Sequence, residues 1–188
     1  MRLRYWPDPV LEAPVDGHVG PVDYDALFAG MLEVMRAHGG VGLAAPQVGV
    51  TARAFVIQVP GGKVTDREPL LCISPGWFTV PPDVVLTEDG ANIAEVKDPG
   101  SQPAQLEEGC LSFPGVKETK TRWDRVVLRY EYPEGNPQEH YLEGTEAQAA
   151  QHETEHLNGI TFAHAWKPAK RDIMRRKIAK VVKQGRTR

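Results

Sequence analysis

The segment from Thr145 to Gly159 constrains the fold of this chain more than any other. Thr145 and Gln148 have the spacing of a capping box, which opens a helix, and Gly159 is a residue type that commonly ends one. Between them lies an HExxH motif that begins at His152 and ends at His156. Residues four apart share one face of a helix, so both imidazoles can reach a single metal ion. The sequence therefore predicts a helix from about residue 145 to 158 that presents two metal ligands.

The glutamate inside the motif suggests hydrolytic chemistry. Glu153 can lie beside a metal-bound water and act as its general base. Zinc endopeptidases share this motif, but the thermolysin-like arrangement needs a glutamate well downstream, and none follows Glu155 in this sequence. The metzincin pattern needs a third histidine where Phe162 stands. Both peptidase classes are disfavoured, and the third metal ligand must come from elsewhere.

A cysteine is the remaining candidate for the third ligand. The chain has two cysteines, Cys72 and Cys110, and a reducing compartment argues against a disulfide between them. A lone cysteine is more often a small buried hydrophobe, which is our interpretation of Cys72 within an apolar strand. Cys110 follows a polar loop. Because the two histidines leave the metal without a third protein ligand, we favour a thiolate ligand at this position. Three protein ligands leave an open position, as in catalysis, whereas a binding module with a structural metal would need four.

Residues 39–49 (GGVGLAAPQVG) form the other unusual segment. Its glycines and alanines let a ligand approach the backbone closely, although such stretches are more often simple turns. Gln47 offers a neutral amide donor suited to a developing oxyanion. The segment does not match a phosphate-binding loop, because it lacks the Gly-Lys-Ser/Thr ending.

Three motifs, in this order and spacing, resemble those of the peptide deformylases. They are residues 40–47 (GVGLAAPQ), 108–112 (EGCLS) and 151–159 (QHETEHLNG), and the likeness extends over nearly the whole chain. The resemblance implies that Cys110, His152 and His156 bind the metal, with water as fourth ligand. It implies that Glu153 is the general acid and base.

The resemblance also implies the substrate and the remaining site residues. Gln47 and the backbone N–H of Leu111 would hold the formyl oxygen as it becomes an oxyanion. The substrate-binding residues would be Val41, Gly42, Gly109 and Lys117. The substrates would be N-formyl-Met nascent peptides, the product formate, and the native metal Fe²⁺, with Zn²⁺ or Ni²⁺ as substitutes.

Some positions depart from the family pattern. Glu155 replaces the usual aspartate, and Lys117 stands where many relatives have an arginine. Thr145 and Ala149 lie where the family tends to place larger apolar residues around the methionine side chain.

The order of elements predicts one α+β domain spanning residues 1–188. We expect largely antiparallel sheets packed around the central HExxH helix, with a C-terminal helix over about 168–184. A first helix should begin after Asp23 as N-cap and end near His38. Strands are expected at 53–59, 70–74 and 84–87, a hairpin at 126–132 and 139–143, and a loop at 97–105.

Charge is concentrated at the C-terminal end. Residues 167–188 contain ten Lys or Arg and one acid, which gives +9 and leaves −12 for the rest of a chain whose net charge is −3. This basic segment is either the solvated face of a surface helix or, as the resemblance implies, a helix that docks on the ribosome. No apolar run approaches the ~20 residues of a membrane span, and the N-terminus lacks the apolar stretch of a signal peptide. We therefore expect no membrane contact and a cytoplasmic location.

Overall fold

The structure is a computed structural model that describes residues 1–16, 21–80, 100–132 and 135–185. The strands in these ranges are β1 (Gly42–Ala44), β2 (Ala54–Ile57), β3 (Leu70–Thr79), β4 (Pro103–Gly109), β5 (Lys117–Trp123), β6 (Arg125–Glu131) and β7 (Pro137–Glu143). The longer helices are α1 (Tyr24–Ala37), α2 (Gly144–Leu157) and α3 (Pro168–Lys183). Short 3-10 helices are η1 (Pro9–Glu12), η2 (Ala45–Val48) and η3 (Phe162–Ala165). None of the helices described is long and apolar enough to cross a membrane.

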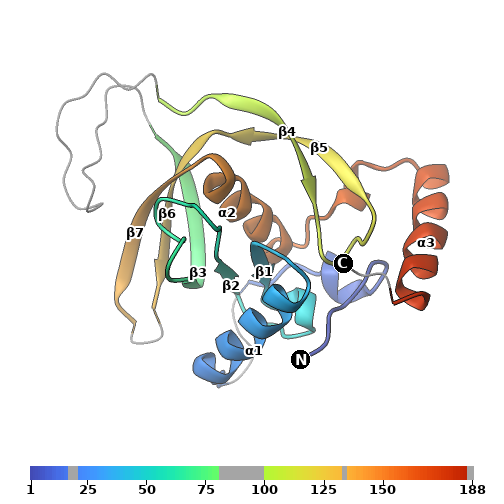
Figure 1. Cartoon of the computed structure of the whole chain (residues 1–188), viewed down its shortest axis with the longest axis horizontal. Helices are drawn as coiled ribbons and strands as arrows, with labels where there is room; N and C mark the ends of the chain where they lie inside the picture. Colours follow the sequence, from blue (N-terminus) through green and yellow to red (C-terminus); the bar gives the residue numbers. More distant parts are fainter. Residues whose placement is uncertain (17–20, 81–99, 133–134, 186–188) are drawn as a thin grey trace.

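The strands form two antiparallel sheets around α2. Five strands pair in the order β1-β2-β3-β6-β7, and β4 pairs with β5 in a long hairpin that arches over α2 (Figure 1). Because side chains alternate along a strand, β2 faces two layers. Phe55 and Ile57 pack in the same cluster as α2, whereas Val56 packs in the same cluster as α1. The predicted fold class, with antiparallel sheets around the HExxH helix, is confirmed.

Helix α2 is buried along most of its length and is fixed at both ends. The side chain of Gln151 donates to the carbonyl of Trp123 at 2.8 Å and accepts from its N–H at 2.9 Å, which ties α2 to the end of β5. Gly159 ends the helix at a φ of +68°, and a Cβ there would lie 2.8–2.9 Å from backbone atoms of residues 12–14. Glycine is thus required both for the turn and for the close crossing of the N-terminal segment.

A third apolar cluster joins the N-terminal segment, the turn after β4 and α3. The rings of Trp6, Phe113, Phe162 and Trp166 contact one another in stacked, tilted and edge-to-face pairs, with centroids 5.3–5.9 Å apart. Ile178 of α3 is buried in the same cluster. Two ion pairs add to this contact, Arg171 with Glu12 and Lys170 with Glu118. Helix α3 is therefore attached to the body of the protein through its first two turns and its apolar stripe.

Most of the predicted elements are confirmed. Asp23 caps α1 by accepting a hydrogen bond from the N–H of Ala26 at 3.0 Å, and Gly39 takes a φ of +67° just beyond the helix. The β6–β7 hairpin and α3 also lie where the sequence predicted them. The strand predicted at 84–87 lies outside the described residues.

Two predictions are wrong. Thr145 does not cap α2, because the helix begins at Gly144 with Glu143 as N-cap and no side-chain cap bond. The amide of Gln148 cannot close a capping box, since it turns away to the carbonyl of Glu107 and the carboxylate of Glu108. The loop predicted over 97–105 already becomes strand β4 at Pro103, where a proline is tolerated as the first residue of a strand.

Candidate metal centre and active site

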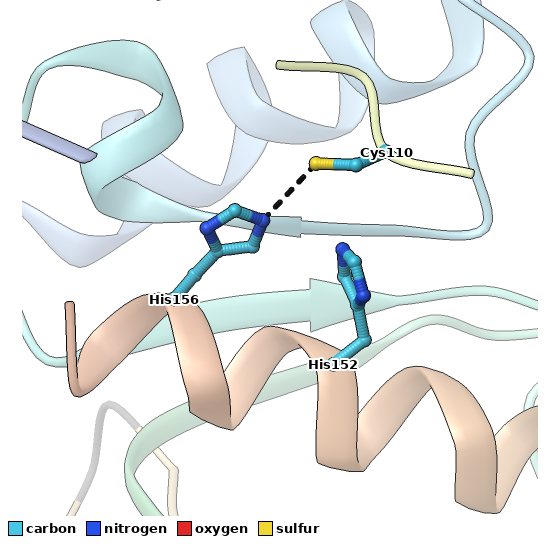
Figure 2. A group of neighbouring side chains, drawn as sticks. All are labelled: Cys110, His152 and His156. Atoms are coloured by element: carbon cyan, nitrogen blue, oxygen red, sulfur yellow. Dashed lines mark hydrogen bonds between the residues drawn. The ribbon is translucent and has the colours of Figure 1, made fainter. Parts of the chain in front are cut away.

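Cys110, His152 and His156 lie close together. Figure 2 shows the thiol of Cys110, from the turn after β4, pointing toward two imidazoles on successive turns of α2. The three candidate ligand atoms lie within 4.8 Å of one another, and Cys110 Sγ is 3.2 Å from His156 Nε2. The structure therefore brings together the three residues that the sequence singled out as metal ligands. Two imidazoles and a thiol are a donor set that could hold a divalent transition metal.

A buried carboxylate orients one of these imidazoles. Glu108 Oε1 lies 3.0 Å from His152 Nδ1, which leaves Nε2 of that ring facing Cys110. Burial raises the pKa of Glu108, but hydrogen bonds from His152 and Arg122 outweigh it and bring this pKa down to about 2. The carboxylate is therefore ionised at neutral pH and fixes the ring orientation, as partners of metal-bound histidines usually do.

Arg122 joins this carboxylate to the glutamate that departs from the family pattern. Its guanidinium contacts Glu108 at 2.6 and 3.0 Å and Glu155 at 2.7 and 3.0 Å, and its side chain is only 4% exposed. Lys120, two residues earlier on the same face of β5, reaches Glu155 at 3.4 Å. Sequence reasoning missed Arg122 because it did not predict β5. The available signal was the alternation of polar and charged residues in KETKTRW.

Glu153 lies in the same cavity and is nearly buried. A Cβ on Gly42 would stand only 2.5 Å from its Oε1, so the glycine leaves the space that this carboxylate occupies. Its other oxygen is buried without a hydrogen-bond partner among the described residues. Burial raises the pKa of Glu153 from its ordinary value to about 7, which suits a group that must both take and give a proton near neutral pH.

Gln47 faces Cys110 from η2. Its Oε1 accepts from the N–H of Ala44 at 2.8 Å, which fixes the orientation of the amide. Its Nε2 then donates to Ser112 Oγ at 3.1 Å and approaches Cys110 Sγ at 3.5 Å. Ser112 was not identified as a functional residue from the sequence, although it belongs to the EGCLS motif.

These groups share a cavity of about 680 Å³. Its lining includes every residue predicted for catalysis or substrate binding, namely Val41, Gly42, Gln47, Gly109, Leu111, Lys117 and Glu153. Lys117 lies at the exposed rim, where its Nζ is 2.7 Å from Glu107 Oε1. His156 is buried behind the cavity rather than in its lining.

Comparison with known proteins identifies the family. The sequence model of the polypeptide deformylases matches residues 1–172. The chain belongs to the polypeptide deformylase family. A peptide deformylase of Thermotoga petrophila is 36% identical over 97% of this chain and 99% of the relative. One of Alkalilimnicola ehrlichii is 38% identical over 99% of this chain and 93% of the relative.

Solved deformylase structures share the fold. A peptide deformylase from Legionella pneumophila superposes with a TM-score of 0.76 at 29% identity, covering 100% of this chain and 98% of the other. A peptide deformylase from Synechococcus elongatus, solved in complex with actinonin, gives a TM-score of 0.70 at 28% identity, covering 98% and 88%. The chain is thus an enzyme of the hydrolase class, like the deformylases that it resembles.

The three deformylase motifs occupy separate elements that meet at the cavity. The first forms β1 and η2, the second forms the end of β4 with the turn after it, and the third is the C-terminal half of α2 with its stop. Gly42, Cys110 and His152 represent the three motifs in the lining. Segments far apart in the chain therefore meet at one cavity.

Proposed function

We propose that this chain removes the formyl group from the N-terminal methionine of nascent polypeptides in the cytoplasm and releases formate. The observation that carries the proposal is the meeting of a thiol and two imidazoles beside a cavity that Cys110, His152 and the buried carboxylate of Glu153 line. Three protein ligands leave a position open for water and substrate, which is typical of a catalytic metal site. The family assignment supports the same reaction.

Cys110, His152 and His156 would hold the metal, and the donor set suits Fe²⁺ as native ion with Zn²⁺ or Ni²⁺ as substitutes. A bound divalent ion supplies Lewis acidity, which makes a water molecule acidic enough to ionise near neutral pH. Burial holds the pKa of His156 well below its ordinary value, which favours the neutral ring that a metal requires. Burial also lowers the pKa of His152, but hydrogen bonds with Cys110 and Glu108 outweigh it and raise this pKa well above its ordinary value, so a metal would displace a proton from this ring.

Glu153 performs the proton transfers in this proposal. It accepts the proton of the attacking water and later returns it to the nitrogen of the leaving amine. With a pKa of about 7 the carboxylate can do both at neutral pH. Gln47 Nε2 and the backbone N–H of Leu111 would donate to the formyl oxygen as negative charge develops on it.

Two strand edges are available to a peptide beside these groups. β1 is the terminal strand of the five-stranded sheet, and β4 pairs only with β5 among the described strands. Residues at the ends of both strands, Gly42 and Gly109, line the cavity. An extended peptide can add to such edges through its main chain, which places the formyl group at Cys110 and Glu153.

The decisive experiment is formate release from formyl-Met-Ala-Ser by protein loaded anaerobically with stoichiometric Fe²⁺. Acetyl-Met-Ala-Ser serves as the control substrate, and metal content is measured on the same sample. Rapid formate release that stops on chelation supports the proposal. Folded, metal-loaded protein that releases no formate above the buffer rate refutes it.

The exposed cations of α3 support a second proposal, that this helix contacts the ribosome. Lys170 and Arg171 are used in ion pairs with the body of the protein, which fixes the helix. Arg176, Lys180 and Lys183 are exposed on the side away from buried Ile178. Such a rigidly held row of cations suits a phosphate backbone, and contacts of this kind weaken steeply with salt.

A further inference from the structure

We infer that Gln148 determines which first residue the site accepts. The site takes a first side chain of methionine's length that ends in a polar amide, such as glutamine, as well as methionine itself. This inference rests on the proposed function, and it names a broader substrate class for the same site.

The argument begins with the face of α2 that forms the floor of the cavity. Thr145, Gln148 and Ala149 precede His152 by seven, four and three residues, so they share its helical face. All four line the cavity. Of the three residues before the histidine, two are polar and the third is the smallest side chain after glycine. This face of the floor thus carries two polar side chains and one small apolar one.

The geometry of a bound peptide directs the first side chain to this floor. With the formyl group beside Glu153 and the main chain between the edges of β1 and β4, successive side chains point alternately toward α2 and toward solvent. The first side chain is the one next to the formyl amide. Pointed inward, it runs along α2 from His152 toward Gln148, and an unbranched chain can reach the amide there.

The amide of Gln148 is only weakly held. Its Nε2 lies 3.4 Å from the carbonyl oxygen of Glu107 and 3.4 Å from Glu108 Oε2, both at the long end of the hydrogen-bond range. The side chain is half-buried, so a first residue seated beside it removes water from the amide. A glutamine amide can replace that water as a partner, whereas a thioether cannot do so well.

The consequence is a lowered preference for methionine over glutamine. Methionine gains from its apolar thioether, but glutamine, which has nearly the same length and the same number of rotatable bonds, gains a hydrogen bond to Gln148. One neutral hydrogen bond changes an equilibrium or rate by about threefold to tenfold. We therefore expect kcat/KM for formyl-Met-Ala-Ser and formyl-Gln-Ala-Ser to differ by no more than about thirtyfold in the natural enzyme.

The test is the ratio of these two kcat/KM values in the iron-loaded enzyme and in Gln148→Met. The variant keeps the length of the side chain and removes its hydrogen-bonding groups. We expect the preference for formyl-Met over formyl-Gln to rise about tenfold. In the variant the new methionine side chain can pack against the substrate thioether, whereas the amide of a substrate glutamine has lost its hydrogen-bond partner. A ratio cancels any general loss of active enzyme. Gln105→Met is the matched control, because Gln105 is exposed on β4, pairs with Thr121 and does not line the cavity. Its ratio should stay at the natural value.

Each further outcome decides the inference. An unchanged ratio in folded, metal-loaded Gln148→Met overturns it. A natural enzyme that cleaves formyl-Met-Ala-Ser but prefers it by clearly more than about thirtyfold over formyl-Gln-Ala-Ser also overturns it, while the proposed function stands. Failure to cleave either substrate overturns both. If Gln148→Met does not fold, competitive inhibition of the natural enzyme by the products Met-Ala-Ser and Gln-Ala-Ser replaces it. Inhibition constants within about thirtyfold of each other then support the inference, and a larger gap opposes it.

Discussion

Replacing Arg122 by methionine should separate the structural role of the buried network from the chemistry of the site. Arg122 makes four contacts of 3.0 Å or less with the carboxylates of Glu108 and Glu155, and its own side chain is 4% exposed. Methionine preserves much of the volume but none of the charge. Glu108, with a side chain 6% exposed, would then keep His152 and the distant Gln148 amide as its only side-chain partners in the described part of the chain.

The magnitude follows from the pKa of Glu108 and from the burial of the pair. The fall from 4.5 to about 2 corresponds to roughly 3 kcal/mol in favour of the ionised carboxylate, shared between His152 and Arg122. Breaking a buried ion pair by removing one partner costs about 3–5 kcal/mol. Glu155 is 27% exposed and retains Lys120, so it adds little. We expect Arg122→Met to lower the free energy of unfolding by about 3 kcal/mol.

The sign of the pH dependence gives an internal check. The folded-state pKa of Glu108 lies below its unfolded value, so its stabilisation is present above about pH 4.5 and is lost as the pH falls toward 2. The difference between the natural protein and Arg122→Met should therefore be full at pH 7 and shrink steadily below pH 4.5. Metal affinity should also fall about tenfold to a hundredfold, because Glu108 orients His152 less firmly.

Urea unfolding of the two proteins at pH 7 and pH 4, followed by circular dichroism, measures the stability difference, and chelator competition measures the metal affinity. Arg129→Met is the matched control. Arg129 also pairs with a glutamate, Glu139, but both side chains are about half exposed or more, so the loss should stay below about 1 kcal/mol. If Arg122→Met loses no more than the control at pH 7, or if its deficit grows on acidification, the network does not stabilise the fold as described.

Three further predictions concern the site and α3. Glu153→Ala should retain a full equivalent of metal and lose turnover by about a thousandfold or more, because the Glu153 carboxylate transfers protons and does not bind the metal. Formate release and metal analysis of the same sample measure this, and retained turnover would exclude the assigned role. Cys110→Ser should bind metal at least about tenfold more weakly in chelator competition, and the iron-loaded natural enzyme should lose activity in air as the thiolate oxidises; normal affinity would show that the ligand set is wrong. Changing Arg176, Lys180 and Lys183 to glutamine should weaken co-sedimentation with ribosomes and reduce its dependence on salt, while kcat/KM on short peptides stays unchanged. Unaltered co-sedimentation would show that α3 does not contact the ribosome.

The α3 experiment uses surface substitutions because the structure makes truncation uninformative. Ile178 is 1% exposed and packs in the cluster that includes Phe113, a residue of the cavity wall. Removing residues from Met174 onward would uncover this cluster and disturb the site. Charge changes on the exposed side avoid that, since they leave the apolar stripe intact.

The candidate site could be predicted from the sequence to the extent that its residues are local. The helical spacing of His152 and His156 requires only a helix, and α2 provides it. The proximity of Cys110 is a tertiary fact, supplied by the turn after β4, and the sequence suggested it only through chemistry: two imidazoles need a third donor. That inference located the residue but could not give the distances.

Strand β5 shows why the rest could not be predicted. Its sequence, KETKTRW, has no alternating apolar residues. The strand pairs only with β4 among the described strands, and one of its faces contacts polar side chains of α2, so it needs no apolar face. Strand prediction depends on an apolar face, so a strand that instead presents Lys120 and Arg122 to a glutamate is not recognised.

The same cause explains the failed capping box. Gln148 has the right spacing, but a carboxylate from β4 lies within reach of its amide and the helix begins a residue earlier. In both places the deciding partner is a charged group that lies far away in the sequence, and such partners concentrate around catalytic sites, where burial makes their pairing obligatory. The sequence therefore failed to predict charged groups that surround the candidate metal ligands, although it identified those ligands themselves.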